Sequence, residues 1–158
     1  MTKKVILLGK FGVGKTSLIS QFVHNKFSEQ YLTTIGVKID KKVINIDGTE
    51  LSMIIWDIAG ESSQAKVPDN YKLGSHGVFF VFDVTRPSTY EHMQSELELI
   101  RALIPDAPIK ILANKADLIA SENLNDLTSS FDQDILLCSA KTGQNVEEAF
   151  YQLGLKML

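Results

Sequence analysis

The stretch GKFGVGKT, residues Gly9–Thr16, decides the fold of this 158-residue chain. The short apolar run Val5–Leu8 comes before it, and an apolar repeat of helical period follows it within Lys15–His24. The order of strand, glycine-rich loop and helix, with the pattern G-x-x-x-x-G-K-[ST], is that of a phosphate-binding loop. Glycines let successive N–H groups turn toward an anion, and the next helix points its positive end at the same place. The stretch therefore predicts a nucleoside triphosphate as ligand.

Two side chains of this loop have separate tasks. Lys15 supplies a positive charge to the β- and γ-phosphates. Thr16 supplies a hydroxyl to Mg²⁺, an ion that prefers oxygen ligands. The residues expected to hold the phosphates are Gly12, Val13, Gly14, Lys15, Thr16 and Ser17.

Composition limits the classes of function. The length suits one domain spanning residues 1–158, and 44% hydrophobic and 22% charged residues are ordinary values for a globular protein. A net charge of −3 argues against a nucleic-acid-binding surface. The single cysteine, Cys138, excludes an intramolecular disulfide, lies in an apolar run and suits a buried thiol. No apolar run approaches the length of a membrane span, so we expect a cytoplasmic protein, peripheral to membranes only through its partners.

Apolar strand-like runs alternate with helical repeats along the chain. This alternation predicts an α/β fold, a mostly parallel sheet with helices on both faces. The runs predicted to form strands are Lys4–Gly9, Lys38–Asp47, Glu50–Asp57, Gly77–Asp83, Ile109–Ala113 and Ile135–Cys138. The segments predicted to form helices are Lys15–His24, Pro87–Ile104, a short stretch around Leu124, Leu127 and Phe131, and the chain from Val146 to its end. The segments predicted to form loops are Asn25–Gly36 and, with a short helix at most, Glu61–Lys72.

The second and third predicted strands meet at Asp47-Gly48, a strong hairpin signal. The hairpin adds one antiparallel strand at an edge of the sheet. Its outer strand carries Lys38, Lys41 and Lys42, which is typical of edge protection. A partner-binding edge is the alternative interpretation.

A second motif, D-x-x-G, lies at the end of the third predicted strand. There the carboxylate of Asp57 is placed beside the phosphate loop and can hold a water molecule of the Mg²⁺ shell. Gly60 allows its backbone N–H to approach the γ-phosphate closely.

A third motif, N-K-x-D, selects the base. The Asp117 carboxylate can accept hydrogen bonds from N1–H and the 2-amino group of guanine, whereas adenine would leave it without donors. The Lys115 stem can lie along the base, and Asn114 can tie this segment to the phosphate loop. The tripeptide Ser139-Ala140-Lys141 follows the next strand, and its backbone N–H at Ala140 can meet guanine O6.

In this order the motifs resemble those of the small GTPases of the Ras superfamily, closest to the Rab branch. The resemblance covers the whole chain and implies the P-loop fold with a six-stranded sheet and five helices. It implies a GTP/GDP switch that uses Mg²⁺ and meets effectors, exchange factors and activating proteins through Tyr31–Val37 and Glu61–Lys72. It further implies that Thr34 joins the Mg²⁺ shell and that Phe27 packs against guanine. Lys15, Gly60 and Glu61 would then surround the γ-phosphate during hydrolysis.

Four features depart from this family. Glu61 stands where the family has a glutamine that orients the attacking water, which predicts slow hydrolysis. Gln64, Ser62 or Ser63 could take over this task, or Glu61 could point to solvent. Phe11 replaces a small residue, so its side chain would crowd an arginine inserted by a partner. The segment between Asp117 and Ser139 is short. The last residues, 156–158, carry no cysteine for prenylation, so we expect no lipid anchor in this chain, or else a truncated sequence.

The sequence suggests three alternative functions. A GTP-hydrolysing switch, expected to be a monomer, is the first, although association through the hairpin edge stays open. A protein that holds GTP as a scaffold with little hydrolysis is the second. A P-loop kinase or ATPase is the third, and the N-K-x-D motif argues against it, as does the presence of only two arginines, Arg86 and Arg101.

Overall fold

The protein folds around a six-stranded sheet in a computed structural model that describes residues 1–28, 36–58 and 67–158. The strands lie in the order β2-β3-β1-β4-β5-β6, and all neighbours are parallel except β2 and β3. The strands are β1 Thr2–Leu8, β2 Val37–Ile46, β3 Thr49–Ile58, β4 Gly77–Asp83, β5 Ile109–Asn114 and β6 Ile135–Leu137. The α-helices are α1 Lys15–His24, α2 Asp69–Lys72, α3 Met93–Leu103, α4 Ser121–Ser129 and α5 Val146–Met157.

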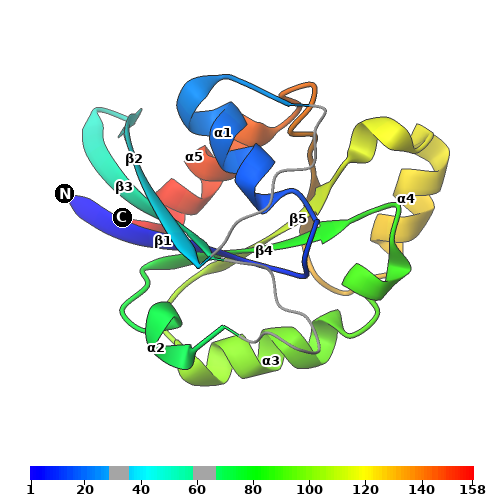
Figure 1. The fold of residues 1–158 in the computed structure, drawn as a ribbon, viewed down its shortest axis with the longest axis horizontal. Helices are drawn as coiled ribbons and strands as arrows, with labels where there is room; N and C mark the ends of the chain where they lie inside the picture. The colour runs from blue at the N-terminus through cyan, green and yellow to red at the C-terminus, as the bar shows by residue number, and fades with distance from the viewer. Residues whose placement is uncertain (29–35, 59–66) are drawn as a thin grey trace.

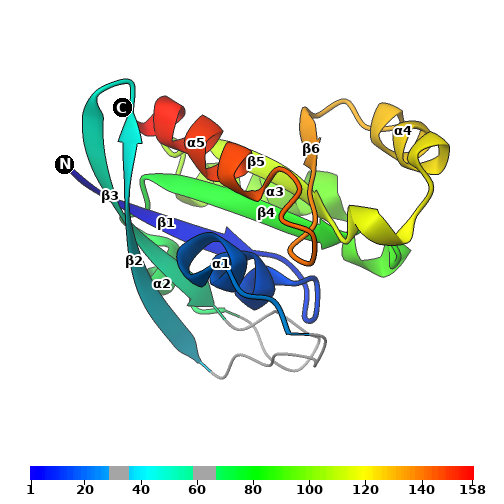
Figure 2. The ribbon, with the colours of Figure 1, turned by 90° about the horizontal axis from the view of Figure 1, so that it is seen from above.

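Helices cover both faces of the sheet. Figure 1 shows α1 and α5 on one face and α2 and α3 on the other, and Figure 2 shows α1 and α5 lying side by side across the strands. Each face has its own apolar core, one closed by α1 and α5 and the other by α3 and α4. All seven residues of β4 are buried because this strand has a neighbour on each side and a core on each face. The predicted fold class is confirmed.

An aromatic cluster fixes the two helices of the first face. The Phe22 ring of α1 stacks on Phe150 of α5 with centroids 3.7 Å apart, and Phe150 meets Phe79 of β4 edge-on at 4.7 Å. All three side chains are at most 2% exposed. Because α1 begins at Lys15, this packing also fixes the first turn that follows the phosphate loop (Gly9–Thr16).

The predicted hairpin is present. Asp47 and Gly48 both have positive φ, 51° and 89°, the conformation that a two-residue type I′ turn requires. The two strands pair from Ile46 with Thr49 outward to Val37 with Ile58. The lysine-bearing strand β2 is an edge of the sheet, as the sequence indicated.

The predicted continuous helix from Pro87 to Ile104 is wrong. Pro87–Thr89 forms a 3₁₀ turn, and α3 begins only at Met93. The Thr89 hydroxyl bonds back to the end of β4, where it accepts from the Asp83 N–H at 3.0 Å. Tyr90 then leaves the helical conformation with φ −134°, and its ring packs against Phe82 and Phe131. Tertiary contacts therefore override the helical repeat at this point.

Other predicted boundaries differ from the observed ones by a few residues. The strand expected at Lys4–Gly9 runs from Thr2 to Leu8, and α4 ends at Ser129, before Phe131. In the described part of the segment Glu61–Lys72, the short helix α2 is present. A second 3₁₀ turn, Ala116–Leu118, was not expected and overlaps the end of the N-K-x-D motif.

We predict that Phe150→Ala lowers the free energy of unfolding by about 3–5 kcal/mol, because it removes a buried ring from between two others. Urea denaturation followed by circular dichroism would measure the loss as a lower midpoint with an unchanged slope. Leu155→Ala on the same helix, at a side chain 44% exposed, is the matched control and should cost far less. Equal losses for the two variants would contradict the assigned packing of α5.

Candidate nucleotide-binding site

The phosphate loop connects β1 to α1 and leaves no room for side chains at two of its glycines. A Cβ on Gly9 would overlap the carbonyl oxygen of Val81, and one on Gly14 would overlap the side-chain nitrogen of Asn114. Both glycines also have positive φ, 151° and 101°. The loop therefore lies directly against β4 and the N-K-x-D segment, and glycine is required at both positions.

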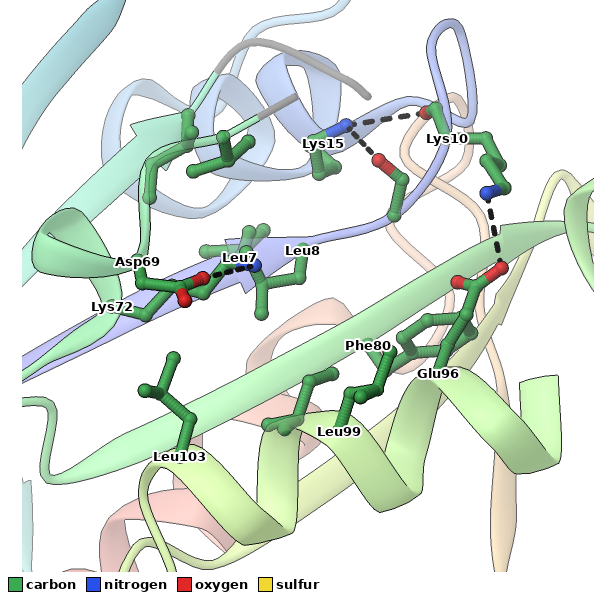
Figure 3. Close-up of a pocket in the computed structure, with 14 residues that line it drawn as sticks. Leu7, Leu8, Lys10, Lys15, Asp69, Lys72, Phe80, Glu96, Leu99 and Leu103 are labelled. Atoms are coloured by element: carbon green, nitrogen blue, oxygen red, sulfur yellow. Dashed lines mark hydrogen bonds and ion pairs between the residues drawn. The ribbon is translucent and has the colours of Figure 1, made fainter. Parts of the chain in front are cut away.

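The side chain of Lys15 folds back onto the start of this loop, and 6% of the residue's surface is exposed. Its Nζ donates to the carbonyl oxygens of Gly9 at 3.1 Å and Lys10 at 3.2 Å (Figure 3). An ammonium group held by loop carbonyls is in place to donate to an anion that the same loop surrounds.

Thr16 at the start of α1 and Asp57 near the end of β3 are in direct contact. The Thr16 hydroxyl donates to the Asp57 carboxylate at 2.6 Å, and Asp57 is 1% exposed. A hydroxyl beside a buried carboxylate is an all-oxygen donor set of the kind that Mg²⁺ prefers. The two residues therefore fit the predicted ion. Thr34, the third residue expected at the ion, lies outside the described residues.

The N-K-x-D segment is bonded to the phosphate loop, as expected. The Asn114 amide donates to the Val13 carbonyl at 2.9 Å, and its oxygen accepts from the Ala140 N–H at 3.2 Å. Lys115 Nζ donates to the Gly12 carbonyl at 3.0 Å, and the residue itself has a left-handed φ of 65°. The two motifs thus form one connected wall.

Asp117 is oriented by the segment after β6. The Ser139 hydroxyl donates to its carboxylate at 2.7 Å and accepts from the Thr142 N–H at 3.1 Å. Ser139 is fully buried, so this bond fixes one oxygen of the Asp117 carboxylate. The two hydrogen bonds of this hydroxyl explain why a serine occupies position 139. The sequence alone did not reveal this role.

Two other expected site residues lie near the surface. Phe27 follows α1 and is 39% exposed, and Lys141 is exposed in the turn after β6. Gly60 and Glu61 lie outside the described residues, so their predicted roles stay predictions.

Sequence reasoning missed Asp83 and did not assign a role to Arg86. Asp83 ends β4, is fully buried and lies 2.8 Å from Lys115 Nζ, a contact between an anion and a cation. Arg86 Nη1 donates to the Phe11 carbonyl at 3.0 Å. The sequence did offer a signal for Asp83, because it is an acidic residue at the end of an otherwise apolar run. The carboxyl ends of parallel strands meet at one edge of a sheet, so such a residue is expected near the site.

A cavity of about 350 Å³ adjoins the phosphate loop on its α3 side. Apolar side chains of β1, β4 and α3 line it, including Leu8, Phe80 and Leu103, with Lys15 at one end (Figure 3). Lys10 and Glu96 form an ion pair at 3.1 Å beside it. The residues expected to recognise the base lie instead at the ends of β5 and β6, so the cavity is separate from the proposed base site.

The sheet order and the phosphate loop define the class of protein as a P-loop nucleoside triphosphatase. The sequence model of the Ras family matches residues 4–158. Ras-related protein Rab-4 of Dictyostelium discoideum is 38% identical, over 93% of this chain and 75% of that protein. Ras-related protein Rab-4A of Mus musculus and of Homo sapiens is 37% identical in each case, over 98% of this chain and 74% of the relative.

The chain therefore belongs to the Ras family and is a Rab-like small GTPase, a GTP-binding switch that hydrolyses GTP. Within the described residues, the longest apolar helices are too short to cross a bilayer.

Cys138 lies directly behind this wall. Its Sγ is 3.8 Å from the Asn114 side-chain oxygen, and it is fully buried. Burial raises the pKa of this thiol from the ordinary value of 9.0 to about 12, because the thiolate would lose its hydration. The predicted inert thiol agrees with this environment.

We predict that the native protein reacts with a chromogenic aromatic disulfide about a thousandfold more slowly than the unfolded protein at pH 8. Two effects act in this direction: burial raises the pKa of Cys138 and so lowers its thiolate fraction, and it also shields the sulfur from the reagent. The release of the coloured thiol, with and without denaturant, measures both rates. Fast native reaction would show that the segment after β6 opens readily.

Proposed function

We propose that this GTPase is specific for guanine nucleotides and binds them with Mg²⁺ across the wall formed by the phosphate loop and the N-K-x-D segment. The observation that carries the proposal is the pair of contacts that join these segments, Asn114 to Val13 and Lys115 to Gly12. They hold an Asp117 carboxylate at a fixed position relative to Lys15. Recognition of a whole nucleotide requires that the residue binding the base and the residue binding the phosphates are held rigidly relative to each other.

Each residue then has a defined task. Lys15 Nζ exchanges its loop carbonyls for phosphate oxygens, and the loop N–H groups of Gly12 to Ser17 surround the same oxygens. Thr16 would hold Mg²⁺ together with Thr34 from the sequence prediction, and Asp57 behind them would hold a water molecule of the Mg²⁺ shell. When bound, the ion neutralises phosphate charge. Hydrolysis is in-line attack by water on the γ-phosphate, and no covalent intermediate is needed.

Asp117 gives the preference for guanine. The hydroxyl of Ser139 holds one of its oxygens at 2.7 Å and so fixes the plane of the carboxylate. Guanine offers two donors to that carboxylate, whereas adenine offers none on the matching edge. A carboxylate oxygen that a bound base covers without donating to it costs about a few kcal/mol, on the order of the discrimination required.

We predict that unlabelled GTP displaces a fluorescent GDP analogue from the protein at a concentration about ten thousandfold lower than ATP does. Fluorescence anisotropy measures both displacement curves. Asp117→Ala should bring the two curves together, while Asp126→Ala, at an exposed acid of α4, should leave them apart. Equal displacement by ATP and GTP in the wild type would refute guanine specificity.

Slow hydrolysis is the second part of the proposal, and it rests on sequence. Glu61 follows the D-x-x-G motif at the position of the family's water-orienting glutamine. A carboxylate there adds negative charge near the γ-phosphate and cannot donate a hydrogen bond while ionised. The alternatives of Gln64, Ser62 or Ser63 acting in its place are outcomes of the same test.

We predict that Glu61→Gln hydrolyses GTP in a single turnover at least about tenfold faster than the wild type. Quenched samples analysed for GDP and phosphate give the rate. A wild-type rate that is already fast and unchanged in Glu61→Ala would contradict the assigned role. If the glutamine variant stays slow and purified wild-type protein carries GTP, the scaffold function is favoured over the switch.

Partners would meet the protein through Tyr31–Val37 and Glu61–Lys72, in keeping with the family. The described end of the second segment is anchored to the sheet by Lys4. Its Nζ donates to the carbonyls of Tyr71 at 2.8 Å and Leu73 at 3.0 Å and lies 3.9 Å from the centre of the Trp56 ring. Partial burial lowers the pKa of Lys4. The exposed side of Tyr71 and the exposed Ile39 of β2 are available to a partner on this face.

The Phe11 side chain affects how an activating protein could approach the phosphate loop. Its side chain is 45% exposed at the phosphate loop. We infer that it crowds the approach of an arginine from an activating protein, so an activator of this GTPase works in another way. A transition-state complex with a partner arginine beside Phe11 would refute this inference. A monomeric state and a cytoplasmic location stay predictions.

A further inference from the structure

Three successive carbonyl groups of the phosphate loop accept hydrogen bonds from side chains at the ends of the central strands. Arg86 donates to Phe11 at 3.0 Å, Lys115 to Gly12 at 3.0 Å and Asn114 to Val13 at 2.9 Å. Lys115 and Asn114 belong to the N-K-x-D motif. Arg86 belongs to none of the motifs and comes from the turn after β4.

The orientation of these carbonyls determines the orientation of the N–H groups that bind phosphate. A trans peptide is planar, and its C=O and the following N–H point in opposite directions. Carbonyls that face the strand ends therefore turn the N–H groups of Gly12, Val13 and Gly14 toward the inside of the loop. The Phe11–Gly12 peptide is the one that depends on Arg86.

Arg86 is itself fixed by the buried end of β4. Its guanidinium lies 3.9 Å from the Asp83 carboxylate, which is fully buried, and its backbone N–H donates to the Asp83 carbonyl at 3.0 Å. The Thr89 hydroxyl donates to the Arg86 carbonyl at 2.7 Å. A side chain 41% exposed to solvent is thus held at both its backbone and its charged end.

Asp83 connects this arginine to the base-recognition segment. One carboxylate oxygen accepts from the N–H and the hydroxyl of Thr85, at 2.8 Å and 2.6 Å. The other lies 2.8 Å from Lys115 Nζ and faces Arg86. One buried negative charge therefore holds two cations that each bind a neighbouring carbonyl of the phosphate loop.

We propose that Arg86, held by Asp83, is a positioning residue that orients the Phe11–Gly12 peptide and so strengthens the hold of the phosphate loop on the nucleotide phosphates. The proposal rests on the proposed function, because it assumes that guanine nucleotide occupies this loop. It assigns a role in nucleotide retention to a residue outside the nucleotide-binding motifs.

The test is the dissociation rate of a fluorescent GDP analogue from the full chain, with Mg²⁺ and excess unlabelled GDP. Arg86→Ala should release the analogue about tenfold faster, because a hydrogen bond from a charged donor to the loop is lost. Arg86→Lys, which keeps a charged donor, should fall between this variant and the wild type. Arg101→Ala removes the other arginine, from the exposed side of α3, and should match the wild type.

A second readout separates positioning from general loosening. Because Arg86 acts on the phosphate side, Arg86→Ala should release the inosine analogue faster by the same factor as the guanine analogue. A reduced preference for guanine over inosine would mean that the segments after β5 and β6 have loosened, and it would overturn the proposal. Unchanged release of GDP from Arg86→Ala would overturn it as well. Failure of the wild type to bind GDP would instead refute the proposed function, and this inference with it.

Discussion

A central strand that is covered on both faces can place polar side chains only near its ends, and this constraint organises the whole protein. β4 is buried along its entire length, and its one charged residue, Asp83, is its last. Asp57 and Asn114 occupy the corresponding places at or near the ends of β3 and β5. Because β1, β3, β4 and β5 are parallel, these ends lie at one edge of the sheet. The chemistry of the site is concentrated there because the apolar cores exclude it elsewhere.

Helix packing on one face supports the same edge. The stacked rings of Phe22 and Phe150 hold α1 against α5, and α1 carries Lys15 and Thr16 in its first turn. The phosphate loop is therefore fixed at one end by an aromatic core and along its length by hydrogen bonds from strand ends. Apolar packing supplies most of the rigidity, whereas the polar contacts set the orientation of individual peptides.

Much of the fold could be predicted because its signals are local. The run Gly77–Asp83 and the helix Lys15–His24 have the bounds that the sequence indicated, and Asp47-Gly48 indicated the hairpin. The break before α3 could not be predicted, because Tyr90 and Met93 both fit a helical repeat, and the interruption depends on tertiary contacts of Thr89 and Tyr90. The motif residues that the structure brings together were predicted from their spacing. The contacts of Asp83 with Lys115 and Arg86 were not predicted, because Lys115 is far from Asp83 in sequence and no spacing rule connects them. The predicted roles of Thr34, Gly60 and Glu61 concern residues outside the described ranges and stay predictions.

The position of the single tryptophan gives the protein a built-in optical reporter. Trp56 directly precedes Asp57 on β3, its ring lies under the ammonium group of Lys4, and Tyr71 of α2 is its aromatic neighbour at 6.5 Å. Indole emission depends on the charges and rings around it, so a change in how α2 sits on the sheet alters the signal from this one residue. The indole fluorescence of the unlabelled chain therefore reports on the surroundings of Trp56, which include α2.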